Sequence, residues 1–178
     1  RYPTFELAGK TLGIIGFGAI GRGAAEIATG FRMRVLTHDA FPFEFPPYTN
    51  QSLKTVLKQS DVISIHAPLT EETRNLIGPD ELATMKPGAL LVNTGRGGIV
   101  NEAALLQSLE SGHLGGAALD VLAEEPPRTN SLIGRTDLNL IITPHSAWSA
   151  REARQRLIDG VVDNIRAWQH GRDRNVVA

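Results

Sequence analysis

The chain has 178 residues, 42% of them hydrophobic and 21% charged, and a formal net charge of −1. This length suffices for one full domain and is too short for two large ones. The sequence contains no basic block that would predict a nucleic-acid or anionic-membrane partner. No apolar run approaches the ~18 residues of a membrane span, and the start of the chain lacks the apolar segment of a signal peptide. The chain has no cysteine, which excludes disulfides and thiolate ligands or nucleophiles and fits a cytoplasmic protein. We predict no metal site.

Strand-like apolar runs alternate with helix-like runs along the chain. Strands are predicted at 12–15, 33–36, 61–65, 89–93, 116–119 and 138–142. Helices are predicted at 19–29, 52–58, 79–85 and 101–111, the last capped by Asn101 and ended by Gly112. Residues 41–47 contain three prolines and are predicted as a loop. Apolar strands separated by helices predict a parallel sheet covered on both faces. This is a doubly wound α/β fold of the Rossmann type, with three layers, α/β/α.

A final helix and tail are predicted over residues 149–178. Ser149 and Glu152 have the spacing of a capping box at the helix start, and Gly171 is predicted to end the helix. The apolar residues of this helix share one face and are predicted to pack in the core: Leu157, Ile158, Val161, Val162, Ile165 and Trp168. Beyond Gly171, residues 175–177 are predicted to be an extended tail.

The glycine motif after the first predicted strand is the clearest indication of function. Gly16-x-Gly18-x-x-Gly21 stands between an apolar run and a helix-prone run, which is the order of a dinucleotide site. Gly16 permits the tight turn, Gly18 lets backbone approach a pyrophosphate, and Gly21 lets the helix pack closely on the strand. The amides of Ala19 and Ile20 would then point at the phosphates, helped by the helix dipole. The alternative is a plain glycine-rich turn, since the chain has 18 glycines.

An acidic residue after the second predicted strand strengthens the dinucleotide interpretation. Asp39 lies 18 residues after Gly21, close to the spacing of about 20 expected for the acid that binds the adenosine ribose hydroxyls. An acid at this place repels a 2′-phosphate, so NAD is favoured over NADP. Arg34 and His38 lie nearby in the sequence and keep NADP as the second possibility.

Polar side chains follow the later predicted strands, and the carboxyl ends of parallel strands form the ligand-binding edge of such folds. Arg96 can hold a substrate carboxylate bidentately. His145 can give a proton to a carbonyl oxygen as hydride arrives, or take it in reverse. Glu125 beside His145 would favour the imidazolium and orient it. Singly, each has a structural alternative: a surface ion pair, a structural histidine and a solvated Glu124–Glu125 pair. Together on a dinucleotide scaffold they predict reduction of a 2-keto acid.

Five segments of this chain occur in the order of one known family: 7–21, 66–70, 93–97, 120–126 and 144–145. On these segments, which span nearly the whole chain, it resembles the NAD-binding domain of the D-isomer-specific 2-hydroxyacid dehydrogenases. The resemblance implies that Arg96, Glu125 and His145 are the catalytic three. Glu125 matches better than Glu124 because it directly precedes a proline, five residues after Asp120.

The same resemblance implies NAD as the cofactor. Asp39 would bind ribose, Asp120 and the Thr94 backbone would hold the nicotinamide carboxamide, and the remaining contacts would come from the glycine motif and from His66, Pro68, Thr73, Gly95 and His145. Residues 144–154 are most similar to the glycerate dehydrogenase and hydroxypyruvate reductase branch. Trp148 would then line the substrate pocket together with Arg96. The alternative is that Trp148 is a core residue at a helix start.

The resemblance also bears on domains and partners. Residues 1–178 would form the NAD-binding domain, with 149–178 as a return helix and tail. The substrate domain would lie outside this chain, which does not begin with Met. This half is expected to bind NAD without full turnover and to form a homodimer near residues 101–127.

Other members of this fold class remain alternatives. The C-terminal binding protein corepressors share the fold and a His-x-x-Trp segment, and would make the chain an NAD-sensing assembly module. Glu125 argues against a formate dehydrogenase, which carries Gln there. A phosphite dehydrogenase stays open.

Overall fold

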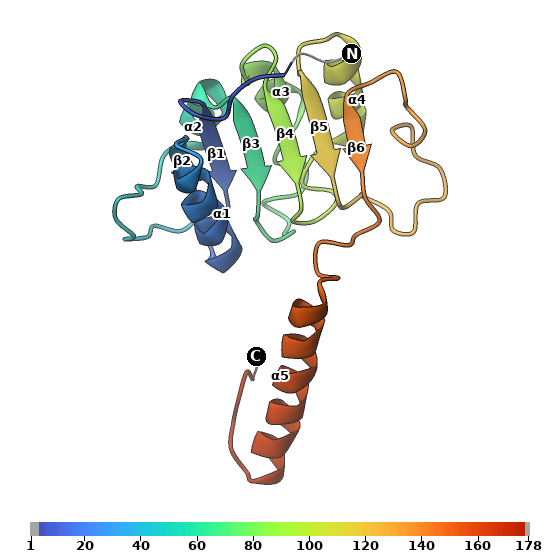
Figure 1. Ribbon diagram of the computed structural model, residues 1–178. Coiled ribbons are helices and arrows are strands. Elements are labelled where there is room, and N and C mark those ends of the chain that lie inside the picture. Colours follow the sequence, from blue (N-terminus) through green and yellow to red (C-terminus); the bar gives the residue numbers. More distant parts are fainter. Residues whose placement is uncertain (1–3, 177–178) are drawn as a thin grey trace. The chain divides into compact units, whose positions relative to one another are not determined.

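Six parallel strands form one sheet in the order β2-β1-β3-β4-β5-β6 in the computed structural model, which describes residues 4–176 (Figure 1). The strands are β1 (Thr11–Ile15), β2 (Arg34–His38), β3 (Val62–Ile65), β4 (Leu90–Asn93), β5 (Gly116–Leu119) and β6 (Leu140–Ile142). Chain order reverses at β1, which pairs with both β2 and β3. The carboxyl ends of β1 and β3 therefore mark the topological switch point, where ligands bind in such sheets.

Two hydrophobic cores lie on the two faces of the sheet. The helices of this part of the chain are α1 (Ala19–Gly30), α2 (Leu53–Gln59), α3 (Pro79–Thr84) and α4 (Glu102–Glu110). Ile15 belongs to the larger core, together with side chains of α2, α3 and α4. Leu12 and Ile14 belong to the other core, together with side chains of α1. Because neighbouring residues of a strand point to opposite faces, β1 is covered on both sides. The predicted doubly wound fold with three layers is confirmed.

The boundaries of the elements follow local sequence signals closely. Asn101 caps α4, its side chain accepting a hydrogen bond from the amide of Ala104 at 2.9 Å. Gly112 has a φ of 72°, which ends the helix as predicted. Two strand boundaries differ from the prediction by two residues, since β2 continues to His38 and β6 begins only at Leu140, and the other strand boundaries agree within one residue. Both differences lie at strand ends, where side-chain pattern is a weak guide.

The chain forms two units, the first ending at Pro144 and the second beginning at His145. The expectations for residues 1–3 and for Val177 lie outside the described residues. Among the helices within residues 4–176, none combines the length and apolarity needed to cross a membrane.

The second unit consists of one helix, α5 (Arg151–Gln169), and the segments around it. The predicted capping box is wrong: Ala150 is the N-cap, and the amide of Ser149 donates to the carbonyl of Ser146 in a turn. Gly171 ends the helix with a φ of 64°, as predicted. The tail is not extended at Asn175, where φ is 52° and the side chain donates to Asn164.

The prediction that the apolar face of α5 packs in the core is also wrong. Its six large apolar side chains are exposed, from 38% at Val162 to 78% at Trp168. Only Ala167 of this helix is buried. The physical reason is that the second unit holds a single helix, and a helix cannot bury its own apolar stripe.

Candidate functional site

The register of the strands places the residues that follow them, most of them predicted site residues, along one edge of the sheet. Ile15 pairs with His38 and Ile65, Ile65 pairs with Asn93, Asn93 with Leu119, and Leu119 with Ile142. The strands therefore end together. The residues that follow them form a row at the carboxyl edge: Gly16, Asp39, His66, Thr94, Asp120 and Thr143.

The glycine loop at the head of α1 has the shape that a pyrophosphate needs. Gly16 has a φ of +90°, and a Cβ there would lie 2.5 Å from the amide nitrogen of Ala67. A Cβ on Gly21 would collide with the carbonyl oxygen of Gly16, so the helix packs directly on the turn. At Gly18 a Cβ would meet nothing within 4 Å, so the space in front of this residue is open.

The first turn of α1 is free of features that would compete with an anion. Gly18 is the N-cap and provides no side-chain hydrogen bond, and the first turn holds no acidic residue. Ala19 and Ile20 are exposed at this end. Amides of a first helical turn lack intrahelical partners and attract anions. The residues present therefore fit a dinucleotide diphosphate.

Asp39 is fixed beside the glycine loop by both of its carboxylate oxygens. Oδ2 accepts a hydrogen bond from the amide of Phe17 at 2.7 Å, and Oδ1 accepts from the amide of Phe41 at 2.9 Å. Asn50 bonds to the backbone of Asp39 on both sides, through its Oδ1 and its Nδ2. A carboxylate oxygen has more than one acceptor site, so each oxygen retains capacity for a ribose hydroxyl. The sequence interpretation missed Asn50, which follows a proline-rich loop and carries no recognisable motif.

Aromatic side chains connect the glycine loop and α1 to the loop at 41–48. The ring of the buried Phe17 lies 4.6 Å from that of Phe43 and 5.3 Å from that of Tyr48. The guanidinium of Arg22 lies 4.6 Å from the centre of the Phe45 ring. Such contacts are attractive, and they tie the loop at 41–48 to α1.

His66 and the segment after it form a closed turn at the end of β3. The Nε2 atom of His66 lies 2.9 Å from the hydroxyl of Ser64. Burial lowers the pKa of His66, which favours the neutral imidazole. Farther along, the hydroxyl of Thr73 donates to the carbonyl of Pro68 and accepts from the amide of Thr70, both at 2.7 Å. Pro68 and Thr73 thus shape the same turn.

The loop that carries Arg96 is organised by a buried asparagine. Asn93, only 1% exposed, donates from Nδ2 to the carbonyl of Arg96 and accepts at Oδ1 from the amide of Gly95. The side chain of Arg96 is exposed, and its Nη1 donates to the carbonyl of Gly95 at 2.8 Å. Thr94 is exposed in the same turn. Asn93 was missed as a functional residue, although an asparagine that ends a strand before glycine is a turn signal.

Asp120 follows β5 and is buried, with 5% of its surface exposed. Its amide donates to the carbonyl of Asn93, and its Oδ1 accepts from the hydroxyl of Thr143 at 2.5 Å. Thr143 was not among the predicted site residues. It orients the carboxylate that the resemblance assigns to the nicotinamide carboxamide.

Glu125 lies in the segment after β5, beside the loop of Arg96. Its Oε1 accepts from the amide of Leu122 at 2.8 Å. A Cβ on Gly97 would collide with the carbonyl oxygen of Leu122. The loop of Arg96 and the segment of Glu125 are therefore in direct backbone contact, and the first unit brings these two predicted residues into neighbouring segments.

His145 and Trp148 belong to the second unit. His145 has a φ of 51°, and its carbonyl accepts from the indole Nε1 of Trp148 at 2.8 Å. Trp148 is 57% exposed, so the alternative of a core tryptophan is wrong. The meeting of His145 with Arg96 and Glu125 stays a prediction.

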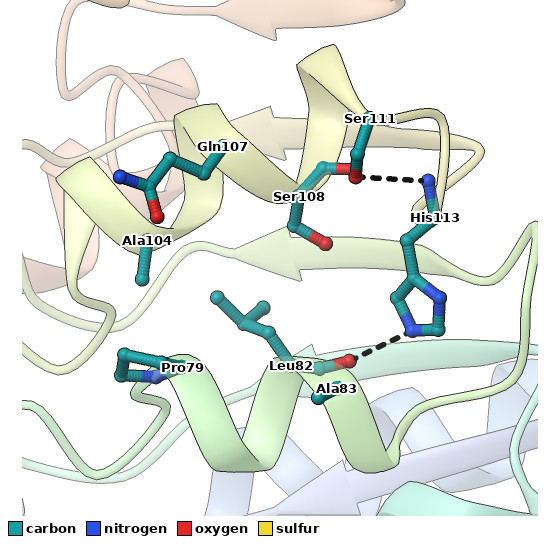
Figure 2. A pocket seen from close by; sticks show the side chains of 8 residues that line it. All are labelled: Pro79, Leu82, Ala83, Ala104, Gln107, Ser108, Ser111 and His113. Atoms are coloured by element: carbon teal, nitrogen blue, oxygen red, sulfur yellow. Dashed lines mark hydrogen bonds between the residues drawn. The ribbon is translucent and has the colours of Figure 1, made fainter.

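A cavity of about 490 Å³ lies elsewhere, between α3 and α4 (Figure 2). Its wall includes Leu82, Ser108 and His113, and the Nε2 atom of His113 lies 3.1 Å from the carbonyl of Leu82. None of the predicted site residues lines this cavity.

Comparison with known proteins gives a family match and several similar relatives. Residues 1–147 match the family described as "D-isomer specific 2-hydroxyacid dehydrogenase, NAD binding domain". The chain is 50% identical over 177 residues to a glycerate dehydrogenase of Methylorubrum extorquens, covering 99% of this chain and 55% of that protein. It is 40% identical over 182 residues to a hydroxypyruvate reductase of Blautia hydrogenotrophica, with the same shares of 99% and 55%.

A solved structure agrees in fold. The chain is similar to a D-lactate dehydrogenase with NAD+ from Lactobacillus jensenii, with a TM-score of 0.87 and 33% identity, covering 99% of this chain and 57% of that one. The chain thus spans about half the length of the relatives it matches. By family match, sequence identity and fold, this chain belongs to the D-isomer-specific 2-hydroxyacid dehydrogenases, as their NAD-binding domain.

Proposed function

We propose that this domain serves an oxidoreductase that transfers hydride between NAD(H) and a small 2-keto or D-2-hydroxy acid, such as hydroxypyruvate or glyoxylate. The observation that carries the proposal is the contact between the loop of Arg96 and the segment of Glu125, next to Asp120 at the end of the neighbouring strand. The relatives named as glycerate dehydrogenase and hydroxypyruvate reductase support this substrate class.

The cofactor side of the site is supplied by backbone amides and by two carboxylates. NAD(H), when bound, supplies or accepts the hydride. The amides after Gly18 would bind its diphosphate, and Asp39 would accept hydrogen bonds from the ribose hydroxyls through its remaining lone pairs. Asp120, held by Thr143, would accept from the carboxamide and so orient the reacting ring.

The substrate side depends on three side chains. Arg96 would hold the carboxylate of the keto acid with its planar guanidinium. His145 would donate a proton to the carbonyl oxygen during reduction and accept it during oxidation. Glu125 would orient the imidazole of His145. Trp148 would line the same pocket.

Arg96→Lys tests the substrate side in the enzyme that carries this domain. We expect kcat/KM for hydroxypyruvate and glyoxylate to fall by about 10²-fold, because a point charge cannot replace a bidentate fork. The Kd for NADH should stay within about twofold. NADH absorbance with each keto acid and a separate NADH titration provide the measurements. A wild-type enzyme that reduces no 2-keto acid would refute the proposed function, and equal damage to both quantities would make Arg96 structural.

Asp39→Ala tests the cofactor preference. Removal of hydrogen bonds to a charged acceptor costs about 1.5–3 kcal/mol, so NADH binding should weaken by at least about tenfold while NADPH binding improves. Asp39→Asn keeps an acceptor for the amide of Phe17 and should lose less NADH affinity. Asp80→Asn, at an exposed position of α3, is the control for loss of a carboxylate. Unchanged affinity for both nucleotides would remove Asp39 from the ribose site.

The resemblance further suggests a homodimer in the cytoplasm, and we propose both. Sedimentation equilibrium of the full enzyme measures the assembly, and fractionation of the source cells measures the location. A monomer at micromolar concentration, or an enzyme outside the cytoplasm, would contradict them.

A further inference from the structure

Glu102 lies at the first position of α4 and connects that helix to the segment after β5. Its Oε1 accepts a hydrogen bond from the amide of Ala123 at 2.6 Å, and its Oε2 accepts from the Nδ2 of Asn130 at 2.8 Å. The two anchored positions stand on either side of Glu125 in the sequence. One carboxylate therefore holds both flanks of the segment that carries the proposed partner of His145.

The two hydrogen bonds of Glu102, to Ala123 and to Asn130, form a clamp. Both ends of this clamp are attached to rigid parts of the first unit. On one side, Asn101 caps the helix start, and Leu105 in the next turn is completely buried. On the other side, the Oδ1 of Asn130 accepts from the amide of Leu132, whose side chain is 1% exposed. A carboxylate in the first turn of a helix is also favoured by the helix dipole.

The clamp has a consequence for Arg96 as well. The carbonyl of Leu122, one residue before the clamped amide of Ala123, lies against Gly97, where even a Cβ has no room. The hydrogen bond from Ala123 to Glu102 thus fixes the segment of Glu125 against the loop of Arg96. The distance between a substrate-binding arginine and a proton-transfer partner affects the rate strongly.

We propose that Glu102 is a positioning residue for the reaction, because it fixes Glu125 relative to Arg96 through Ala123 and Asn130. This inference rests on the proposed function. Glu102 touches neither substrate nor cofactor in this account; it acts through the segment that it holds.

The test compares Glu102→Gln with Glu110→Gln in the full enzyme. Gln at 102 has one acceptor oxygen, so it can accept from the amide of Ala123 or from the Nδ2 of Asn130 but not from both. Glu110, in the last turn of the same helix, bonds to Arg135 instead, so its variant controls for the loss of a polar tie from α4. Asn130→Ala breaks the other half of the clamp and should behave like Glu102→Gln.

Three readouts are expected from the Glu102 and Asn130 variants. Hydrogen exchange of the segment 121–130 should become about tenfold faster, as expected for the loss of one hydrogen bond to a charged group. The kcat for keto-acid reduction should fall by more than the KM for the keto acid rises, because Glu125 is displaced while Arg96 can still bind the carboxylate. The Kd for NADH should stay within about twofold. The Glu110 variant should show neither faster exchange in this segment nor a lower kcat.

Two results would overturn the proposal. Unchanged exchange in 121–130 would show that Glu102 does not hold the segment, and an equal loss of kcat in the Glu110 variant would show a merely structural role. If the wild-type enzyme reduces no 2-keto acid, the positioning role fails with the proposed function. Faster hydrogen exchange of 121–130 in the variants would then support the clamp, and only the proposed reaction would be refuted.

Discussion

His145→Ala in the enzyme that carries this domain is expected to lower the rate of keto-acid reduction by about 10²–10⁴-fold, the usual contribution of a general acid. The Kd for NADH should change little, because the residues proposed to bind the diphosphate and the ribose follow other strands. Stopped-flow measurement of NADH oxidation with hydroxypyruvate separates this chemical step from binding.

The control for His145→Ala is His170→Ala. His170 follows the end of α5, and its ring Nδ1 lies 2.7 Å from the carbonyl of Arg166. This variant should reduce hydroxypyruvate at the wild-type rate. A His145→Ala enzyme with a near-normal rate would remove His145 from the mechanism.

Gly21→Ala is expected to destroy most of the cofactor affinity. The new Cβ would collide with the carbonyl oxygen of Gly16, so either the glycine turn or the start of α1 must move. Overpacking of this kind costs about 1–3 kcal/mol of stability. NADH affinity should fall by more than about tenfold, since the amides proposed to bind the diphosphate lie in the displaced backbone.

Gly23→Ala is the matched control on the same helix. A Cβ at Gly23 meets nothing within 4 Å, and alanine is favoured over glycine in a helix by about 1 kcal/mol. Its melting temperature should equal or exceed that of the wild type, with unchanged NADH affinity. Wild-type affinity and stability in Gly21→Ala would show that the helix does not pack on the turn as described.

The sequence alone was sufficient to predict the sheet and the residues that follow its strands. Each strand is a short apolar run ended by a polar or glycine residue, and parallel strands must expose those ends on one edge. The positions of Gly16, Asp39 and Asp120 at that edge follow from this rule without any knowledge of tertiary contacts.

The residues that support the site could not be predicted in the same way. Asn50 holds Asp39, and Thr143 holds Asp120 across 23 residues of sequence. Glu102 reaches Asn130 across 28 residues. Such pairs depend on how separate loops approach one another in space, and neither periodicity nor a short motif reports that approach.

The apolar stripe of α5 shows the converse case, in which the sequence pattern predicted burial that the structure does not have. Its periodicity correctly predicted a helix with one apolar face, but periodicity does not identify what covers that face. Val161 and Trp168 are 50% and 78% exposed. A stripe of this kind was interpreted as core packing because burial is its commonest use in globular proteins.

The most direct test of the account is calorimetric titration of this chain with NADH and, separately, with NADPH. The glycine loop and the fixed carboxylate of Asp39 predict saturable binding of NADH, with NADPH at least about tenfold weaker. Absence of binding by either nucleotide would contradict the account, because Gly16, Gly18 and Gly21 would then form only a structural turn.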